Sequence, residues 1–283
     1  MSNHLCIVTG ASGYLGSQVK TKFAHQGWKV LELTRTPVIG TRAIAFQLGK
    51  AVAHENLSGA QALVHCAYDF TLINQKDIWK VNVQGTEKLF SAAREAGVEK
   101  IVCISTISAF EGCQSLYGQA KLEIEKIAAQ HGALSIRPGL IYGDPPGGMF
   151  GHLVEQVEKF KIIPLVGDGS QIQYLVHQDD LCDFIYRYCT GEIPLPDTVV
   201  TAAHEKGWTL RELLEAIARQ KGQKRIFLGL PWPLLLAALR TAELLHIPLK
   251  FHSDSVVSLM NQNLKPDFTH NHKLGLHCRP FSI

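Results

Sequence analysis

An α/β fold with a doubly wound parallel sheet is the fold class that this sequence predicts. Short apolar runs rich in β-branched residues alternate with longer helical patterns through the first half of the chain, and this alternation is typical of strand-helix-strand units. A glycine-rich turn follows the first apolar run directly. The 283 residues are sufficient for one large domain with a buried core and a smaller appendage.

The expected elements follow from this alternation. The predicted strands cover residues 5–8, 29–33, 43–46, 62–66, 101–105 and 133–136, and the main predicted helices cover residues 14–26, 82–96 and 118–130. After Gly143 the sequence enters a proline- and glycine-rich loop, and the regular alternation stops. We therefore expect a dinucleotide-binding domain over residues 1–143 and a mainly substrate-binding region over residues 144–283, with some of its elements returning to the sheet.

Composition excludes several classes of protein. The apolar share of 46% and the charged share of 19% exclude a disordered chain, and a net charge of +3 is too weak for a nucleic-acid surface. The seven cysteines are odd in number and form no C-x-x-C pair, which favours free thiols in a reducing compartment. Because the first residues also lack the pattern of a signal peptide, we expect a cytoplasmic protein whose partner is a small-molecule substrate.

One uncharged run, residues 226–239, raises the question of a membrane. It is shorter than the roughly 20 residues that a spanning helix needs, and Pro231 and Pro233 interrupt it. We expect a helix packed on the protein core, with a membrane-surface helix as the alternative, so that peripheral association stays open.

The glycine turn predicts a dinucleotide site. Three glycines, Gly10, Gly13 and Gly16, lie between the first strand and the first helix. In a Rossmann fold such glycines permit a tight turn, a close approach to a pyrophosphate and close packing of the helix, whose N-terminus attracts the anion. The residues expected to contact the cofactor here are Gly10, Ser12, Gly13, Tyr14, Leu15 and Gly16.

The end of the second strand indicates which dinucleotide is bound. NAD-binding sites carry an acidic residue there, whereas an arginine accommodates the 2′-phosphate of NADP. This chain has Thr34 and Arg35 at that place, and Glu32 lies two residues too early. The sequence therefore favours NADP, with NAD as the alternative.

A tyrosine and a lysine form the candidate catalytic pair. Tyr117 and Lys121 are four residues apart on a predicted helix and share one face. Bringing a phenol from a pKa of about 10 to about 7 requires roughly 4 kcal/mol, and a neighbouring ammonium favours the phenolate. The same spacing also occurs on ordinary exposed helices and is not specific by itself. The glycine turn earlier in the chain makes the catalytic interpretation the favoured one.

These motifs in their order resemble the short-chain dehydrogenase/reductase superfamily, and more narrowly its extended branch, the NAD-dependent epimerase/dehydratases. The resemblance covers roughly residues 4–220. Its further motifs are Asn82-Val83-Gln84-Gly85-Thr86, Ser105-Thr106, Tyr117-Gly118-Gln119-Ala120-Lys121, Arg137-Pro138-Gly139-Leu140-Ile141-Tyr142-Gly143 and Val176-His177-Gln178-Asp179-Asp180.

The resemblance implies hydride transfer between a nicotinamide and a substrate carbon that bears an alcohol or carbonyl. It implies that Thr106 bonds the substrate oxygen, that Tyr117 exchanges a proton with it, and that Lys121 bonds the nicotinamide ribose. Ala67 and Pro138 would lie along the cofactor. A hydroxyl at a strand end can instead bond its own backbone, and Ser105 or Ser108 could replace Thr106. A homodimer is a family expectation.

Departures from the family pattern leave the substrate open. Many nucleotide-sugar enzymes carry an arginine for the diphosphate where this chain has Ile172 and Gln173, and a neutral amide cannot replace its bidentate contact. We consider an oxidoreductase or epimerase of a nucleotide-sugar derivative, a reductase or dehydrogenase of an apolar alcohol, and a non-catalytic NADP-binding scaffold. The leucine-rich residues 230–249 could line an apolar pocket, although burial within the substrate region is the favoured interpretation. The histidines near the C-terminus lack metal-ligand spacing, so no metal site is expected.

Overall fold

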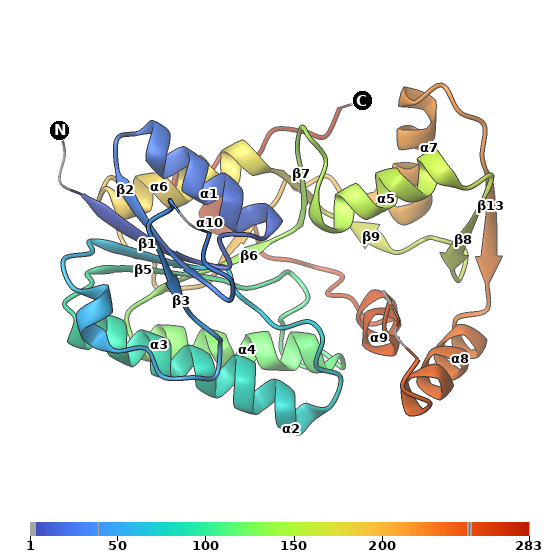
Figure 1. Cartoon of the computed structure of the whole chain (residues 1–283). Coiled ribbons are helices and arrows are strands. Elements are labelled where there is room, and N and C mark those ends of the chain that lie inside the picture. The colour runs from blue at the N-terminus through green and yellow to red at the C-terminus, as the bar shows by residue number, and fades with distance from the viewer. Residues whose placement is uncertain (1–3, 39, 248, 250, 283) are drawn as a thin grey trace.

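A seven-stranded parallel sheet forms the larger lobe of the computed structural model, which describes residues 4–38, 40–247, 249 and 251–282 (Figure 1). The strand order is β11-β6-β5-β4-β1-β2-β3. The chain therefore winds outward in both directions from the β1–β4 pair, and this reversal of direction is where such folds bind their ligands. The strands are β1 (Leu5–Thr9), β2 (Lys29–Thr34), β3 (Ala43–Ala45), β4 (Ala62–His65), β5 (Lys100–Ile104), β6 (Leu134–Pro138) and β11 (Val200–Ala202).

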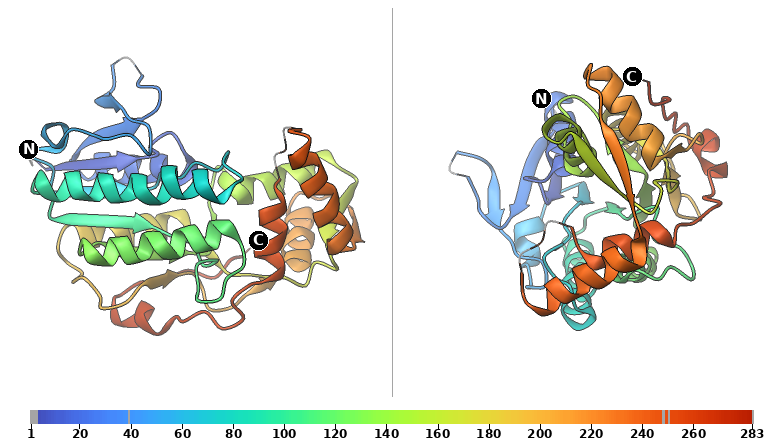
Figure 2. Two further views of the ribbon diagram at one scale, coloured as in Figure 1. Left: turned by 90° about the horizontal axis from the view of Figure 1, so that it is seen from below. Right: turned by 90° about the vertical axis from the view of Figure 1, so that its right-hand side faces the viewer.

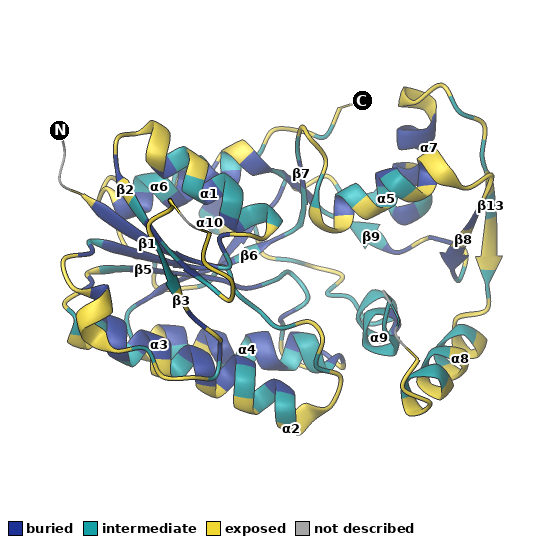
Figure 3. Cartoon of the chain, in the orientation of Figure 1, coloured by how far each residue is buried: buried dark blue, intermediate teal, exposed yellow. Residues whose placement is uncertain are grey.

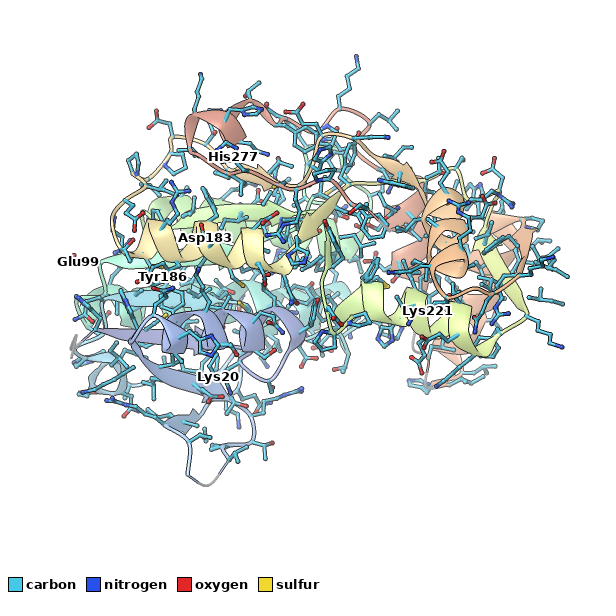
Figure 4. The ribbon with its side chains drawn as sticks, turned by 90° about the horizontal axis from the view of Figure 1, so that it is seen from above. Lys20, Glu99, Asp183, Tyr186, Lys221 and His277 are labelled. Atoms are coloured by element: carbon cyan, nitrogen blue, oxygen red, sulfur yellow. The ribbon has the colours of Figure 1, made fainter. Side chains whose placement is uncertain are left out.

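Helices cover both faces of this sheet. One face carries α1 (Tyr14–His25) and α6 (Gln178–Cys189), and the other carries α3 (Gln84–Glu95) and α4 (Leu116–Gln130). Lys22 links α1 to α6, because its Nζ lies 2.9 Å from the Asp183 carboxylate and 5.6 Å from the centre of the Tyr186 ring (Figure 4). The predicted doubly wound α/β class is thus confirmed.

The predicted strands and helices of the first half differ from the observed ones by a few residues at most. The α4 helix begins at Leu116, earlier than the predicted residue 118, because Ser115 caps it by accepting a hydrogen bond from the Gly118 N–H at 3.1 Å. The helix expected over residues 82–96 is longer, since α2 (Gln75–Ile78) and the π-turn η2 (Trp79–Val83) lead directly into α3.

The second half of the chain contributes to both lobes. Strand β11 pairs with β6, and α6 packs on α1, so both elements extend the larger lobe. The short helix α10 (Thr269–Lys273) also lies against β11. The remaining segments form a smaller lobe beyond the carboxyl ends of the strands (Figure 1).

Short strand pairs and helices build the smaller lobe. The parallel pairs are β7 with β10 and β8 with β13, and β9 pairs with β12 in antiparallel fashion. A separate apolar core lies between these strands, α5 and α7. The elements are β7 (Leu140–Tyr142), α5 (Gly148–Lys159), β8 (Ile162–Val166), β9 (Ile172–Gln173), β10 (Leu175–His177), β12 (Trp208–Thr209), α7 (Leu210–Gln220), β13 (Ile226–Leu230), α8 (Trp232–Leu244) and α9 (Ser253–Met260); a 3-10 turn, η1 (His54–Leu57), lies in the larger lobe.

The expectation for residues 226–239 is wrong. The segment is not one core helix but strand β13, which pairs with β8 along its length, followed by α8 after Pro231. None of the residues of α8 is buried (Figure 3). The segment is apolar, as its sequence shows, but among the described elements α8 packs mainly against α9. No helix in the described part of the chain is long and apolar enough to cross a bilayer.

Candidate active site

The glycine turn has the geometry that its sequence predicts. Gly10 has φ of +65°, and a Cβ atom there would lie 3.0 Å from the Ala67 backbone nitrogen. A Cβ atom on Gly16 would lie 2.2 Å from the Gly10 carbonyl oxygen. Side chains at both positions would therefore force apart β1, the end of β4 and the first turn of α1.

The N-terminus of α1 has room and donors for an anion. Its N-cap residue is Gly13, which supplies no side-chain cap, and the first turn contains no acidic residue. Ser12 and Gly13 are exposed, whereas Leu15 packs against the core. Free N–H groups, the positive end of the helix dipole and the lack of a capping or acidic side chain fit a dinucleotide pyrophosphate.

Tyr14 has a different environment from its neighbours in the turn. A Cβ atom on Gly147 would lie 2.3 Å from the Tyr14 ring, so the ring packs on the first residues of α5 and on the loop before it. Its hydroxyl is buried without a hydrogen-bond partner among the described residues. Tyr14 thus connects the glycine turn to the smaller lobe.

The end of β2 carries no carboxylate that could bind a ribose. Thr34 is its last residue, and Arg35 follows as an exposed side chain. Glu32 forms an ion pair with Lys20 on α1, with an N–O distance of 3.2 Å. The only carboxylate of β2, that of Glu32, is therefore already paired with the Lys20 ammonium.

Tyr117, Lys121 and Thr106 are brought together at the carboxyl end of β5. Burial raises the pKa of Tyr117 to about 12, and a hydrogen bond with the Thr106 side chain opposes this rise. The Lys121 Nζ donates to the Ile104 carbonyl oxygen at 2.6 Å, and burial lowers its pKa. The predicted pair therefore lies at one place together with the predicted hydroxyl.

The environment of Lys121 differs in one respect from our expectation. We expected its ammonium to favour the Tyr117 phenolate, but burial sets the pKa of this phenol and Thr106 is the group that lowers it. Lys121 instead lies 5.0 Å from the centre of the Tyr68 ring. Desolvation raises the pKa values of the Cys66 and Cys103 thiols to about 12, and the Lys121 charge opposes this rise.

The hydroxyls of Thr106, Ser105 and Ser108 are candidates for contact with the substrate. The structure gives Ser105 and Thr106 different partners. The Ser105 hydroxyl binds the Glu125 carboxylate, which also forms an ion pair with Arg137 at 2.6 Å. The Thr106 hydroxyl accepts a hydrogen bond from the Ser108 N–H at 3.2 Å and contacts Tyr117 as well. The Ser105 hydroxyl is therefore held by Glu125, whereas the Thr106 hydroxyl contacts both the backbone and the Tyr117 side chain.

An aromatic wall, defined by Tyr68 and Phe70, borders Tyr117. The Tyr68 and Tyr117 rings meet edge to face at 5.0 Å, and Phe70 lies 5.5 Å from Tyr117 and is 63% exposed. The buried Asn82 fixes this segment. Its side-chain oxygen accepts a hydrogen bond from the Asp69 N–H at 2.7 Å, and its side-chain nitrogen donates one to the Asp69 carbonyl oxygen at 3.3 Å. Aromatic side chains thus cover the Tyr117 ring on this side.

Asp254 is a site residue that the sequence interpretation missed. Its carboxylate accepts hydrogen bonds from the backbone N–H groups of Leu116 at 2.7 Å and Tyr117 at 3.0 Å. These are orphan donors of the first turn of α4, and an anion there is favourable. Because Asp254 is separated from them by more than 130 positions in the chain, no local sequence signal could have identified it.

The place of the missing arginine is filled by neutral groups. Gln262 binds the N–H and the carbonyl oxygen of Ile172 at 3.0 and 2.9 Å. The Gln173 amide nitrogen is buried without a partner among the described residues. Of the remaining predicted residues, Pro138 ends β6 in a buried position and Ala67 donates its N–H to Thr9 at 3.2 Å, so both lie at the carboxyl edge. No cluster in the described part of the chain has three or more side chains suited to a metal.

Comparisons with known proteins agree with this architecture. Residues 6–202 match the model of the NAD dependent epimerase/dehydratase family. A ceramide reductase from Caulobacter vibrioides is 27% identical over 241 residues, covering 82% of this chain and 75% of that protein. A 3-beta-hydroxysteroid dehydrogenase from Mycolicibacterium neoaurum is 27% identical over 218 residues, covering 60% of this chain and 58% of that protein.

The fold is also found among solved structures. The UDP-glucose 4-epimerase from Thermotoga maritima, solved with UDP-glucose, superposes with a TM-score of 0.74 at 18% identity and covers 97% of this chain and 94% of its own. At that identity the likeness shows the fold. Together with the family match, which extends over most of the chain, it confirms the resemblance seen in the motifs. The chain therefore belongs to the NAD dependent epimerase/dehydratase family of enzymes.

Proposed function

We propose that this protein is an NADP(H)-dependent oxidoreductase that interconverts a ketone and a secondary alcohol on a lipid. The observation that carries this proposal is the Tyr117–Thr106 pair bordered by the aromatic wall. It combines a proton-transferring phenol with an apolar approach for the substrate.

The residues divide the chemistry between them. The bound cofactor would supply or accept the hydride. Thr106 would hold the substrate oxygen, and Tyr117, whose high pKa keeps it protonated near neutrality, would donate a proton to that oxygen during reduction. Lys121, which now binds the Ile104 carbonyl, would bind the hydroxyls of the nicotinamide ribose.

The preference for NADP rests on the end of β2. An exposed Arg35 and the absence of a carboxylate at Thr34 favour a 2′-phosphate, because a guanidinium forms strong bidentate contacts with phosphate. Glu32 does not oppose this preference, since Lys20 neutralises it.

The preference for a lipid rests on the site and on the relatives. Gln173 and Ile172 replace the arginine that would meet a sugar nucleotide's diphosphate, and two relatives are named for ceramide and for a steroid. The chain covers only 58% of the steroid relative, so the relatives support the substrate class and not one substrate. A nucleotide-sugar derivative is the second candidate, favoured by the fold of the structural neighbours.

A reducing compartment such as the cytoplasm fits the thiols. All seven cysteines are free, and five of them are buried. We therefore place the reaction there as part of the proposal.

A direct assay separates these alternatives. Purified protein is incubated with NADPH and either long-chain or steroidal ketones or nucleotide-sugars, and cofactor oxidation and product are measured. We expect turnover of the lipid ketones, and no thermal stabilisation by UDP. Stabilisation by UDP together with turnover of a nucleotide-sugar would establish the second candidate.

A pair of variants tests whether the chain is a catalyst at all. Tyr117→Phe removes the proton donor and should lower kcat by at least about a hundredfold, whereas Tyr186→Phe, on the opposite face of the sheet, should not change it. Unchanged activity in Tyr117→Phe would contradict the assignment, and binding of NADPH with no turnover of any substrate would favour the scaffold.

A further inference from the structure

An exposed apolar surface lies at the end of the smaller lobe. In the β8–β13 pair, Ile226 lies opposite Ile162 and Leu228 opposite Pro164, so these four side chains share one face. Ile162, Ile226 and Leu228 are 54%, 64% and 52% exposed, and the alternate residues of β8 point into the core. This strand face thus presents apolar side chains to solvent.

Helix α8 adds further exposed apolar side chains at this end of the lobe. It follows β13 directly, and both elements form the end of the lobe that faces the viewer in the right-hand view of Figure 2. Leu234, Leu244 and Leu245 are 69%, 78% and 67% exposed, and Figure 3 shows the helix without a buried residue. We call the exposed side chains of β8, β13 and α8 the apolar end face.

Of the two charged side chains of α8, only the cation Arg240 is exposed. The helix contains two charged residues, Arg240 and Glu243. Glu243 turns inward, where its carboxylate binds the N–H of Ser253 at 2.7 Å and its hydroxyl at 2.6 Å. A helix that is apolar on nearly all sides is normally buried, and an extended exposed apolar patch marks a surface that binds something.

A basic rim borders the apolar end face where β8 and β13 begin. Lys161 directly precedes Ile162, and Arg225 directly precedes Ile226. The rim consists of Lys159, Lys161, Arg219, Lys221, Lys224 and Arg225.

This rim has a net positive charge. Residues 219–225 contain four cations and no carboxylate. Glu158, an acidic neighbour, forms an ion pair with Lys221 at 2.6 Å, and Figure 4 shows Lys221 on this lobe. Arg225 holds the Val157 carbonyl at 2.6 Å and fixes the rim to α5.

We propose that the apolar end face docks on an anionic phospholipid bilayer. Exposed leucine and isoleucine side chains would enter the boundary of the acyl chains, and the basic rim would meet the headgroup phosphates. The 13 residues of α8 are too few to cross a bilayer but suit a helix that lies in its surface. A second copy that docked through the same face would bring the same cations to the contact.

The docked face is connected to the active site. Ser253, which Glu243 holds, begins α9, and the next residue, Asp254, binds the backbone of Tyr117. If the substrate is a lipid, as the proposed function states, docking places the aromatic wall near the membrane that supplies it. The docking itself does not depend on that function.

Vesicle flotation of the full-length protein tests this proposal. We expect binding to vesicles of phosphatidylcholine with phosphatidylglycerol, weaker binding to phosphatidylcholine alone, and loss of binding at high salt. The double variant Leu234→Asp/Leu244→Asp should weaken binding by about tenfold or more, whereas the equally exposed Leu264→Asp should not. Lys161→Glu/Lys224→Glu should remove the preference for the anionic vesicles.

The controls keep the two proposals separate. The double variant and Leu264→Asp should both retain the wild-type melting temperature and NADPH affinity, since none of the three leucines is buried. Equal vesicle binding by wild type and Leu234→Asp/Leu244→Asp would overturn the docking proposal. A wild-type protein that does not bind vesicles would also overturn it. If, in that case, the double variant dissociates a dimer, the apolar end face is a contact between two copies of the chain. Vesicle binding without turnover of any lipid ketone would refute the proposed function and leave the docking intact.

Discussion

Removal of the Asp254 carboxylate should loosen the N-terminus of α4, the helix that carries Tyr117. In Asp254→Ala, the N–H groups of Leu116 and Tyr117 lose acceptors at 2.7 and 3.0 Å. Hydrogen bonds to a charged group contribute about 1.5–3 kcal/mol each when well buried, and an anion at a helix N-terminus about 0.3–1 kcal/mol. Because Asp254 is only partly buried and water can replace it, we expect a total loss of about 2 kcal/mol in the free energy of unfolding.

This loss has two measurable consequences. The melting temperature should fall by about 5 °C, and kcat/KM should fall by about tenfold because Tyr117 lies in the affected turn. Asp254→Asn, which keeps one acceptor without the charge, should lie between Ala and wild type. Asp267→Ala is a matched control, since Asp267 also binds an N–H and a hydroxyl, both of Thr269, but far along the chain from α4.

Thermal melts by circular dichroism and steady-state kinetics on the same preparations provide the readouts. Wild-type melting temperature and wild-type kcat/KM in Asp254→Ala would refute the reasoning, because the bonds between the Asp254 carboxylate and α4 would then contribute neither stability nor activity. A fall in melting temperature equal to that of Asp267→Ala, with unchanged kinetics, would show that Asp254 supports the fold without positioning Tyr117.

Three further predictions concern the cofactor, the core and pH. Arg35→Ala should weaken NADPH binding by about tenfold or more and leave NADH binding unchanged, as titrated by fluorescence, whereas the exposed Arg42→Ala should affect neither; equal losses for both cofactors would contradict the assignment. Glu125→Gln should destabilise the fold by about 3 kcal/mol in urea denaturation, because the partly buried Arg137 guanidinium and the Ser105 hydroxyl lose their anion. Glu123→Gln, in an exposed ion pair with Lys126, should cost below about 0.5 kcal/mol. Similar losses of stability in the two variants would contradict this ranking. Burial lowers the pKa of His65 to about 3, so below its ordinary pKa of about 6.5 the unfolded chain binds the extra proton and stability falls as pH falls. His65→Gln should remove about 1.4 kcal/mol per pH unit of this slope between about pH 6 and about pH 4, and an unchanged slope would place the titration elsewhere.

The parts of the fold predicted from sequence are those with local signals. Gly10 and Gly16 mark the turn because only a residue without a Cβ atom fits their backbone and contacts. Tyr117 and Lys121 share a face because helical spacing alone requires it. Strands β1, β4 and β5 are almost continuously apolar because both faces of a parallel sheet are covered.

The parts that could not be predicted depend on long-range packing. Strand β11 joins the sheet beside β6 through a pairing of distant segments, and Asp254 binds the Tyr117 backbone although 137 positions separate the two residues. The apolar run of residues 226–239 predicts a helix packed on the core, because composition does not show whether a partner surface exists. Lys121 was expected to act on Tyr117, but the packing of Tyr68 against its ammonium could not be seen in the spacing.

The most direct test of the account is a crystal structure of the protein with bound NADP⁺. The central claim is that Tyr117, Thr106 and Lys121 face the reactive ring of a dinucleotide held by the glycine turn. We predict that the pyrophosphate lies at the N-terminus of α1, that the Lys121 Nζ binds the nicotinamide ribose, and that the Tyr117 hydroxyl lies beside the ring. A cofactor bound elsewhere, or a Lys121 that keeps only its contacts with the Ile104 carbonyl and the Tyr68 ring, would contradict it.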